Sequence, residues 1–124
     1  MVVKKNAIHE LEKFKQKLKF GKQTKPTFYS GLSKPILQPK LTDLLNNSAD
    51  DFKKTAQTNR TENNFQADIK TGINRFNIYY LDLDTEDRER ICSYYEELMD
   101  CVGLESSGGV LNTWMYGFDP TRKK

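Results

Sequence analysis

Residues that support catalysis are scarce in this chain. It contains one histidine, His9, and two cysteines, Cys92 and Cys101, among 124 residues. These numbers exclude the common Cys/His zinc patterns and leave no second histidine to activate a thiol nucleophile. Neither a GxSxG elbow nor a phosphate loop of the GxxxxGK[ST] type is present. The sequence therefore predicts a protein that is not an enzyme and has no cofactor and no metal site.

Long apolar runs and a disulfide framework are also missing. No segment reaches the length of a signal peptide's apolar region or of a transmembrane helix. Cys92 and Cys101 lie nine residues apart in a predicted helix, which places them on opposite faces and about 13 Å apart along its axis. They cannot bridge each other in that arrangement. Two reduced thiols are typical of a cytoplasmic protein, and we expect that location.

Arginine is absent from the N-terminal third, where lysine carries the charge. Residues 1–40 contain ten lysines and two acidic residues, for a net charge of +8. Residues 41–119 contain seven basic and fifteen acidic residues, for a net charge of −8, and residues 120–124 add +3. The sequence thus combines a basic N-terminal arm with an acidic body. The simplest expectation is that the arm lies against the body.

What is present is a set of helical apolar stripes. Apolar residues recur every three or four positions, as on one buried helix face, over residues 4–20, 39–58, 59–81, 85–102 and 110–116. We predict an all-α fold, an irregular bundle of four main helices plus a short C-terminal helix. The alternative is an α+β fold with a small hairpin, in which residues 78–81 would form a strand.

The clearest helix boundaries belong to the fourth predicted helix. Asp84 or Thr85 can cap its N-terminus with a side-chain oxygen, and Gly103 can take the left-handed conformation that ends a helix. Gly21 is expected to end the first helix. Gly72 lies inside the third, where glycine costs about 1 kcal/mol relative to alanine, so it predicts a close crossing by another helix.

We predict one helical domain, residues 1–124, whose parts are a basic amphipathic helix (1–22), a loop-rich crossover (23–38), a helical body (39–117) and a basic tail (118–124). The apolar stripe of the first helix consists of Ile8, Leu11, Phe14 and Leu18. Phe28-Tyr29 and Ile36-Leu37 are expected to hold the crossover against the body. The first helix is either part of the core with a solvated lysine face or a functional arm.

The best local candidate for a ligand contact is the loop from Glu105 to Gly109. Its backbone N–H groups open a helix and can hold an anion, although a tight turn explains the same residues. The acidic run Asp82–Asp87 suggests calcium, but an EF-hand would need glycine at position 87 and glutamate at position 93, so helix capping is the better interpretation. Candidate contacts with a ligand or partner are Tyr79, Asp82, Asp84, Glu105, Ser106, Ser107 and Trp114.

Three motifs carry a resemblance to a known family. They are Asp84–Arg90, Gly103–Ser107 and Trp114–Gly117. Together they resemble the C-terminal half of a small bacterial family known as a domain of unknown function and numbered 4844. The resemblance implies a compact, mainly helical bacterial protein, and it implies no activity or catalytic residue.

Three functions are consistent with these observations. The first is a non-catalytic protein-interaction module that recognises an unknown protein partner through its acidic, tyrosine-bearing surface, in one form as an immunity protein that blocks a basic toxin. The second is a lysine-rich arm that binds nucleic acid or a membrane surface. The third is a small-molecule binder or enzyme that uses the loop Glu105–Gly109.

Overall fold

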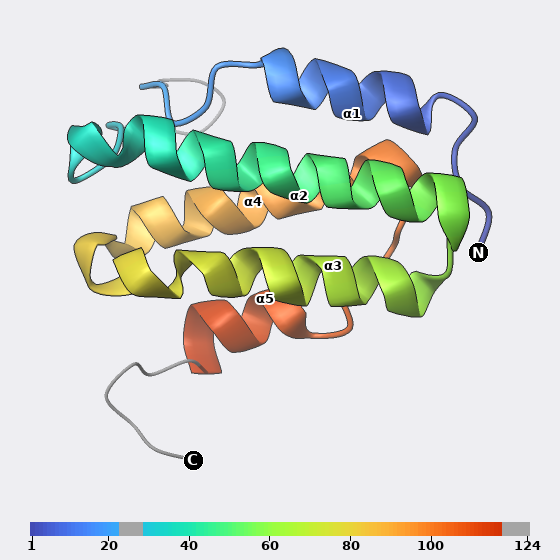
Figure 1. Ribbon diagram of the computed structural model, residues 1–124. Coiled ribbons are helices and arrows are strands. Elements are labelled where there is room, and N and C mark those ends of the chain that lie inside the picture. The colour runs from blue at the N-terminus through green and yellow to red at the C-terminus, as the bar shows by residue number, and fades with distance from the viewer. Residues whose placement is uncertain (23–28, 118–124) are drawn as a thin grey trace.

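The computed structural model describes residues 1–22 and 29–117, and within them it is an all-α bundle with no β-strand. α1 lies along α2 at the top of the view, α4 lies behind α2 and α3, and α5 lies below α3 (Figure 1). The predicted fold class is therefore confirmed, and the hairpin alternative is wrong. The elements are α1 Ala7–Gln16, η1 Pro35–Leu37, α2 Gln38–Thr58, α3 Glu62–Asn74, η2 Arg75–Asp82, α4 Thr85–Val102, α5 Val110–Asn112 and η3 Thr113–Gly117.

α2, α3 and α4 meet at Gly72, as its position predicted. A Cβ atom on Gly72 would lie 2.1 Å from the Ser48 Oγ of α2 and 2.6 Å from the Tyr95 hydroxyl oxygen of α4. Those two hydroxyls form a buried hydrogen bond of 2.7 Å. Only a residue without a side chain permits this crossing.

α4 begins and ends as the sequence predicts. The Asp84 carboxylate accepts a hydrogen bond from the Asp87 N–H at 2.8 Å, and the Asp87 carboxylate accepts one from the Asp84 N–H at 3.1 Å, which completes a capping box. Gly103 ends the helix with φ of 84°. Both ends of α4 are thus set by local residues.

α1 is shorter than predicted, because it ends at Gln16 and not at Gly21. The Lys19 ammonium turns back and donates to the carbonyls of Phe14 and Lys17, which satisfies free carbonyls at the helix end. Phe20 then adopts a left-handed backbone with φ of 63°. As a result Leu18 is 75% exposed and does not belong to the buried stripe.

The third predicted helix changes type halfway. Thr61 caps α3, since its hydroxyl accepts a hydrogen bond from the Asn64 N–H. After Asn74 the chain continues as the 3-10 helix η2, so residues 78–81 are not a strand. Phe76 and Tyr80 remain buried, as predicted.

The C-terminal segment also changes type, from the single α-turn α5 to the π-helical turn η3. Leu111, Trp114 and Met115 are buried, as the sequence predicts. In the crossover Tyr29 is buried, whereas Ile36 is 85% exposed, so the prediction that Ile36 holds the crossover was wrong. Phe28 and the predicted basic tail lie outside the described residues.

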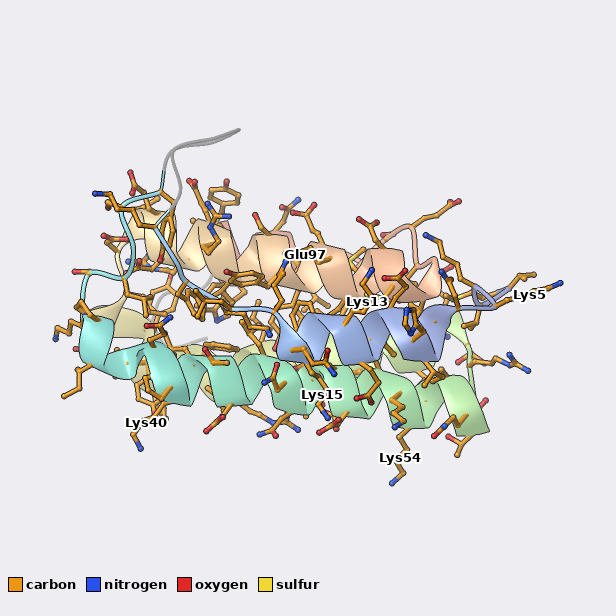
Figure 2. All side chains as sticks on the ribbon, turned by 90° about the horizontal axis from the view of Figure 1, so that it is seen from above. Lys5, Lys13, Lys15, Lys40, Lys54 and Glu97 are labelled. Carbon is orange, nitrogen blue, oxygen red and sulfur yellow. The ribbon has the colours of Figure 1, made fainter. Side chains whose placement is uncertain are left out.

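The basic arm lies against the acidic body. Lys15 forms an ion pair with Asp50 of α2 at 2.7 Å, and Lys17 forms one with Glu97 of α4. In Figure 2 Lys13 lies on the side of α1 that faces α4, and Lys15 on the side that faces α2. The arm's lysines therefore neutralise carboxylates of the body. In the part of the chain that the structure describes, no helix has the length and hydropathy to cross a bilayer.

Candidate functional site

One face of α4 carries a stripe of exposed carboxylates, which we call the acidic stripe. Its members recur every three, four or seven residues, so they share one side of the helix, and they are Glu86, Glu89, Glu96 and Asp100, with Ser93 between them. Among the described residues none of these carboxylates forms an ion pair. Glu86, Glu89 and Glu96 therefore carry negative charge that no ion pair compensates in that part of the chain, whereas Asp100 also borders the trough between α1 and α4, which three lysines line.

A groove of about 440 Å³ runs between the acidic stripe and the segment α5–η3. Glu105 adds a third carboxylate to those of Glu89 and Glu96 along it. Met99 and Met115, both largely buried, give it an apolar floor, and the 76% exposed Tyr116 forms part of its rim. We call this the acidic groove. It combines negative charge, flexible methionines and an aromatic edge, all of which favour contact with a cationic partner.

The predicted contact loop lies at this groove, but its polar groups hold the loop together. The Ser106 hydroxyl accepts a hydrogen bond from the Gly108 N–H at 3.0 Å, and the Ser107 hydroxyl accepts one from the Leu111 N–H at 3.4 Å. The Gln66 side chain donates to the Ser106 carbonyl at 3.0 Å. Because three carboxylates border the same groove, the loop is better suited to a cation than to the anion considered from sequence.

Three other predicted contacts do not lie at the acidic groove. Tyr79 and Asp82 belong to η2, and Asp84 precedes α4, so they lie at the end of the bundle where the chain passes from α3 to α4 (Figure 1). Asp82 is engaged in an ion pair with Lys34, and Asp84 is used as the α4 cap. Tyr79 is half-buried. The structure therefore separates these three predicted contacts from Glu105, Ser106 and Ser107.

The short helices η1 and η2 carry exposed aliphatic side chains. Ile78 and Leu81 are each 79% exposed, and they project from the same side of η2 because residues three apart eclipse in a 3-10 helix. Ile36 of η1 is exposed as well, and the Lys34–Asp82 ion pair joins the two segments. We call Ile36, Ile78 and Leu81 the apolar end. It is a second possible contact surface.

Trp114 has a structural position. Only 3% of it is exposed, its indole N–H donates to the Asn77 side-chain oxygen at 2.8 Å, and its ring packs edge-on against Tyr80 with centroids 5.4 Å apart. It borders a smaller cleft of about 200 Å³ together with Gly109 and Val110. Trp114 thus fixes η3 against η2 and does not line the acidic groove.

The two thiols lie on opposite faces of α4, as predicted, and both are free. Cys92 lines the acidic groove, where burial, with Glu96 and Glu89, raises its pKa to about 12. Cys101 borders the trough between α1 and α4, and burial, with Glu10, raises its pKa to about 11. Both thiols are protonated at neutral pH. Within residues 1–22 and 29–117 no group of three or more His, Cys, Asp and Glu side chains could hold a metal ion.

The sequence patterns did not predict that the carboxylates of α4 form one stripe. They also did not predict that Met115 and Tyr116 line a groove. The stripe has a signal in the sequence, the spacing of Glu89, Glu96 and Asp100 on one helix face. The opposite wall of the groove has none, because it depends on how η3 packs against α4.

The fold and groove define a small all-α protein with an acidic face on α4. The family model of DUF4844, a domain of unknown function, matches residues 2–119, and the chain belongs to that family. A similar structure is the crystal structure of a DUF3571 family protein from Acinetobacter baumannii AYE, with a TM-score of 0.78 and 34% sequence identity. The alignment covers 90% of this chain and 89% of that chain. A comparison with curated proteins found no match.

Proposed function

We propose that this protein is a non-catalytic interaction module whose acidic groove and acidic stripe bind a basic segment of a partner protein. The observation that carries the proposal is the set of carboxylates Glu89, Glu96 and Glu105, which form no ion pair within residues 1–22 and 29–117 and border a groove that Met99 and Met115 also line. A lysine or arginine side chain suits such a groove, since its aliphatic stem packs on methionine while its charged head meets carboxylate. An immunity-like role, in which the partner is a basic toxin, is the specific form.

The remaining groups at the groove support binding over catalysis. The Cys92 thiol is protonated at neutral pH because burial raises its pKa to about 12, so it is a poor nucleophile. The serine hydroxyl oxygens of the loop accept hydrogen bonds from its own backbone. Two free cysteines also support the cytoplasmic location that the proposal includes.

The alternative of a nucleic-acid-binding or membrane-binding arm has less support. Lys15 and Lys17 form ion pairs with carboxylates of the body, and Lys19 is fully buried. These charges are less available for phosphates than the sequence suggested.

The test compares two double variants that change the net charge equally. Glu89→Gln with Glu96→Gln removes two charges at the groove, and Asp43→Asn with Glu62→Gln removes two exposed charges on α2 and α3. Wild type and both variants, tagged and at equal amounts, are used to recover partners from the native host, with quantification by mass spectrometry. We expect a stoichiometric basic partner whose recovery falls at least about tenfold with the groove variant only.

Three results would contradict the proposal. One is an equal loss of the partner with both variants, which indicates a general charge effect. Another is a loss caused by Ile78→Ser with Leu81→Ser while the groove variant binds normally, which moves the interface to the apolar end. The third is the absence of any stoichiometric partner, which counts against a protein-interaction module.

A further inference from the structure

A second cavity, of about 280 Å³, lies on the other side of α4 and has the opposite charge. The chain after α1 runs beside α4, since Lys17 pairs with Glu97 and the Phe20 N–H donates to the Tyr94 hydroxyl at 2.7 Å. Arg90, Tyr94 and Glu97 share one face of α4 because they are spaced by four and three residues. The cavity is lined by Lys17, Leu18, Gly21, Lys22, Arg90, Tyr94 and Glu97.

Hydrogen-bond donors exceed acceptors in this cavity. Among the described residues that line it, the only carboxylate is that of Glu97, and Lys17 pairs with it. Within the described residues neither Lys22 nor Arg90 has an ion-pair or hydrogen-bond partner. The Tyr94 hydroxyl oxygen accepts a hydrogen bond from Phe20, and its own proton has no acceptor in the same part of the chain. Such a donor set is complementary to an anion.

Arg90 is held in place before any ligand arrives. Its guanidinium group stacks on the Tyr29 ring, 4.6 Å from the centroid. The Tyr29 hydroxyl in turn donates to the buried Asp87 carboxylate at 3.1 Å, and the Ser33 N–H donates to the other oxygen of Asp87 at 3.2 Å. A stacked arginine loses less side-chain freedom on binding than a free one, so its contribution to affinity is larger.

We propose that this cavity binds a small dianionic phosphate monoester, with Arg90 as the main ligand and Lys22 and the Tyr94 hydroxyl as further donors. The planar guanidinium group can donate two parallel hydrogen bonds to a phosphoryl group. At about 280 Å³ the cavity lies just below the range of roughly 300–1,000 Å³ typical of drug-sized ligands, so the ligand is small. This site is separate from the acidic groove and does not depend on the proposed partner.

The neighbouring trough between α1 and α4 lacks this bias. It is larger, about 560 Å³, but Glu10, Glu97 and Asp100 balance its three lysines. Of these two neighbouring cavities, only the one of about 280 Å³ has basic side chains in excess of carboxylates among the described residues, and the proposal concerns that cavity.

The test titrates the full chain with glycerol 3-phosphate and inorganic phosphate at low salt, by calorimetry and by backbone NMR shifts. Malonate serves as a dicarboxylate of equal charge. We expect saturable one-to-one binding of glycerol 3-phosphate, with shifts at residues 17–22 and 90–97. Arg90→Lys should weaken the affinity at least about tenfold, because lysine cannot make the bidentate contact. Lys22→Ala should weaken it several-fold.

Lys40→Ala is the matched control, because Lys40 points away from the other helices on the outer side of α2 (Figure 2). Its affinity should stay within about twofold of wild type. The proposal is overturned by a lack of saturable binding, by equal weakening with Lys40→Ala, or by tighter binding of malonate than of either phosphate. Lys22 is exposed and forms no hydrogen bond or ion pair within residues 1–22 and 29–117, so its variant remains informative if Arg90→Lys is unstable.

Discussion

The two sides of α4 carry similar acidic residues that differ in whether they are paired within the fold. Glu97 faces the N-terminal arm and pairs with Lys17, whereas its neighbour Glu96 faces the acidic groove and has no basic partner among the described residues. On the arm side Glu97 is neutralised within the fold, and Arg90 and Lys22 have no ion-pair partner among the described residues. On the groove side Glu89 and Glu96 have no ion-pair partner in the same part of the chain. The position of a charge on the helix face, and not the composition, decides whether it is paired within the fold.

The largest expected effect distinguishes two carboxylates of this one helix. Asp87→Ala removes the acceptor for Tyr29, for the Ser33 N–H and for the Asp84 N–H. Because it leaves buried donors unsatisfied and breaks the cap, we expect a loss of about 2–4 kcal/mol in the free energy of unfolding. Glu96→Ala should change it by less than about 0.5 kcal/mol. Urea unfolding of both variants measures the difference, and equal losses would remove the contrast between the two sides.

The next largest loss of stability is expected at Gly72, where α2, α3 and α4 cross. Gly72→Ala improves helix propensity by about 1 kcal/mol but places a methyl group against the Ser48 and Tyr95 hydroxyls. We expect a net loss of about 1–3 kcal/mol from overpacking. A thermal melt measures it. Thr71→Ala, at an exposed position of α3, is the control and should leave the melting temperature almost unchanged.

Lys19 makes the free energy of unfolding dependent on pH. Its folded pKa, about 8, lies below the unfolded value of 10.5, so between these values the unfolded chain binds more protons and stability rises with pH. The stability difference between wild type and Lys19→Met should therefore shift in favour of wild type by about 1–2 kcal/mol from pH 7 to 9.5. Urea unfolding at both pH values measures the shift. A constant difference would show that Lys19 titrates normally.

The smallest effects should have opposite signs on the two sides. Lys17→Met removes an exposed ion pair with Glu97 and should cost about 0.2–1 kcal/mol. Glu96→Gln relieves repulsion with Asp100, four residues later on the same face, and should stabilise by about 0.2–0.5 kcal/mol. Both changes should shrink in high salt. Paired chemical unfolding at two salt concentrations measures them, and a loss of stability in Glu96→Gln would mean that Glu96 has a partner in solution.

Sequence predicted the parts of the fold that local chemistry sets. Asp84 and Gly103 are caps that act within a few residues, and the structure confirms their roles. The end of α1 was misjudged. Lys19 turns back onto the Phe14 and Lys17 carbonyls, and the Phe20 N–H donates to the Tyr94 hydroxyl, 74 residues away. No local pattern contains that information.

In the candidate site too, the features set by neighbouring residues could be predicted from the sequence, and those set by distant residues could not. The loop Glu105–Gly109 could be found because its serines and glycines mark a turn at a helix start. The carboxylates of α4 were visible in the sequence, but their grouping with Tyr116 follows from the packing of η3. Asp87 was expected only as a member of the acidic capping run Asp82–Asp87, and its hydrogen bonds with Tyr29 and Ser33, far earlier in the chain, could not be predicted.

The contact at Gly72 fixes how the bundle can move. Sliding α3 by one turn would bring Ile69 or Phe76 to the Ser48–Tyr95 hydroxyl pair, where a single carbon already collides. α3 therefore has one axial register between α2 and α4. When a partner occupies one side of α4, the bundle can accommodate it by tilting helices about this point or by turning side chains, and not by translating one helix past another.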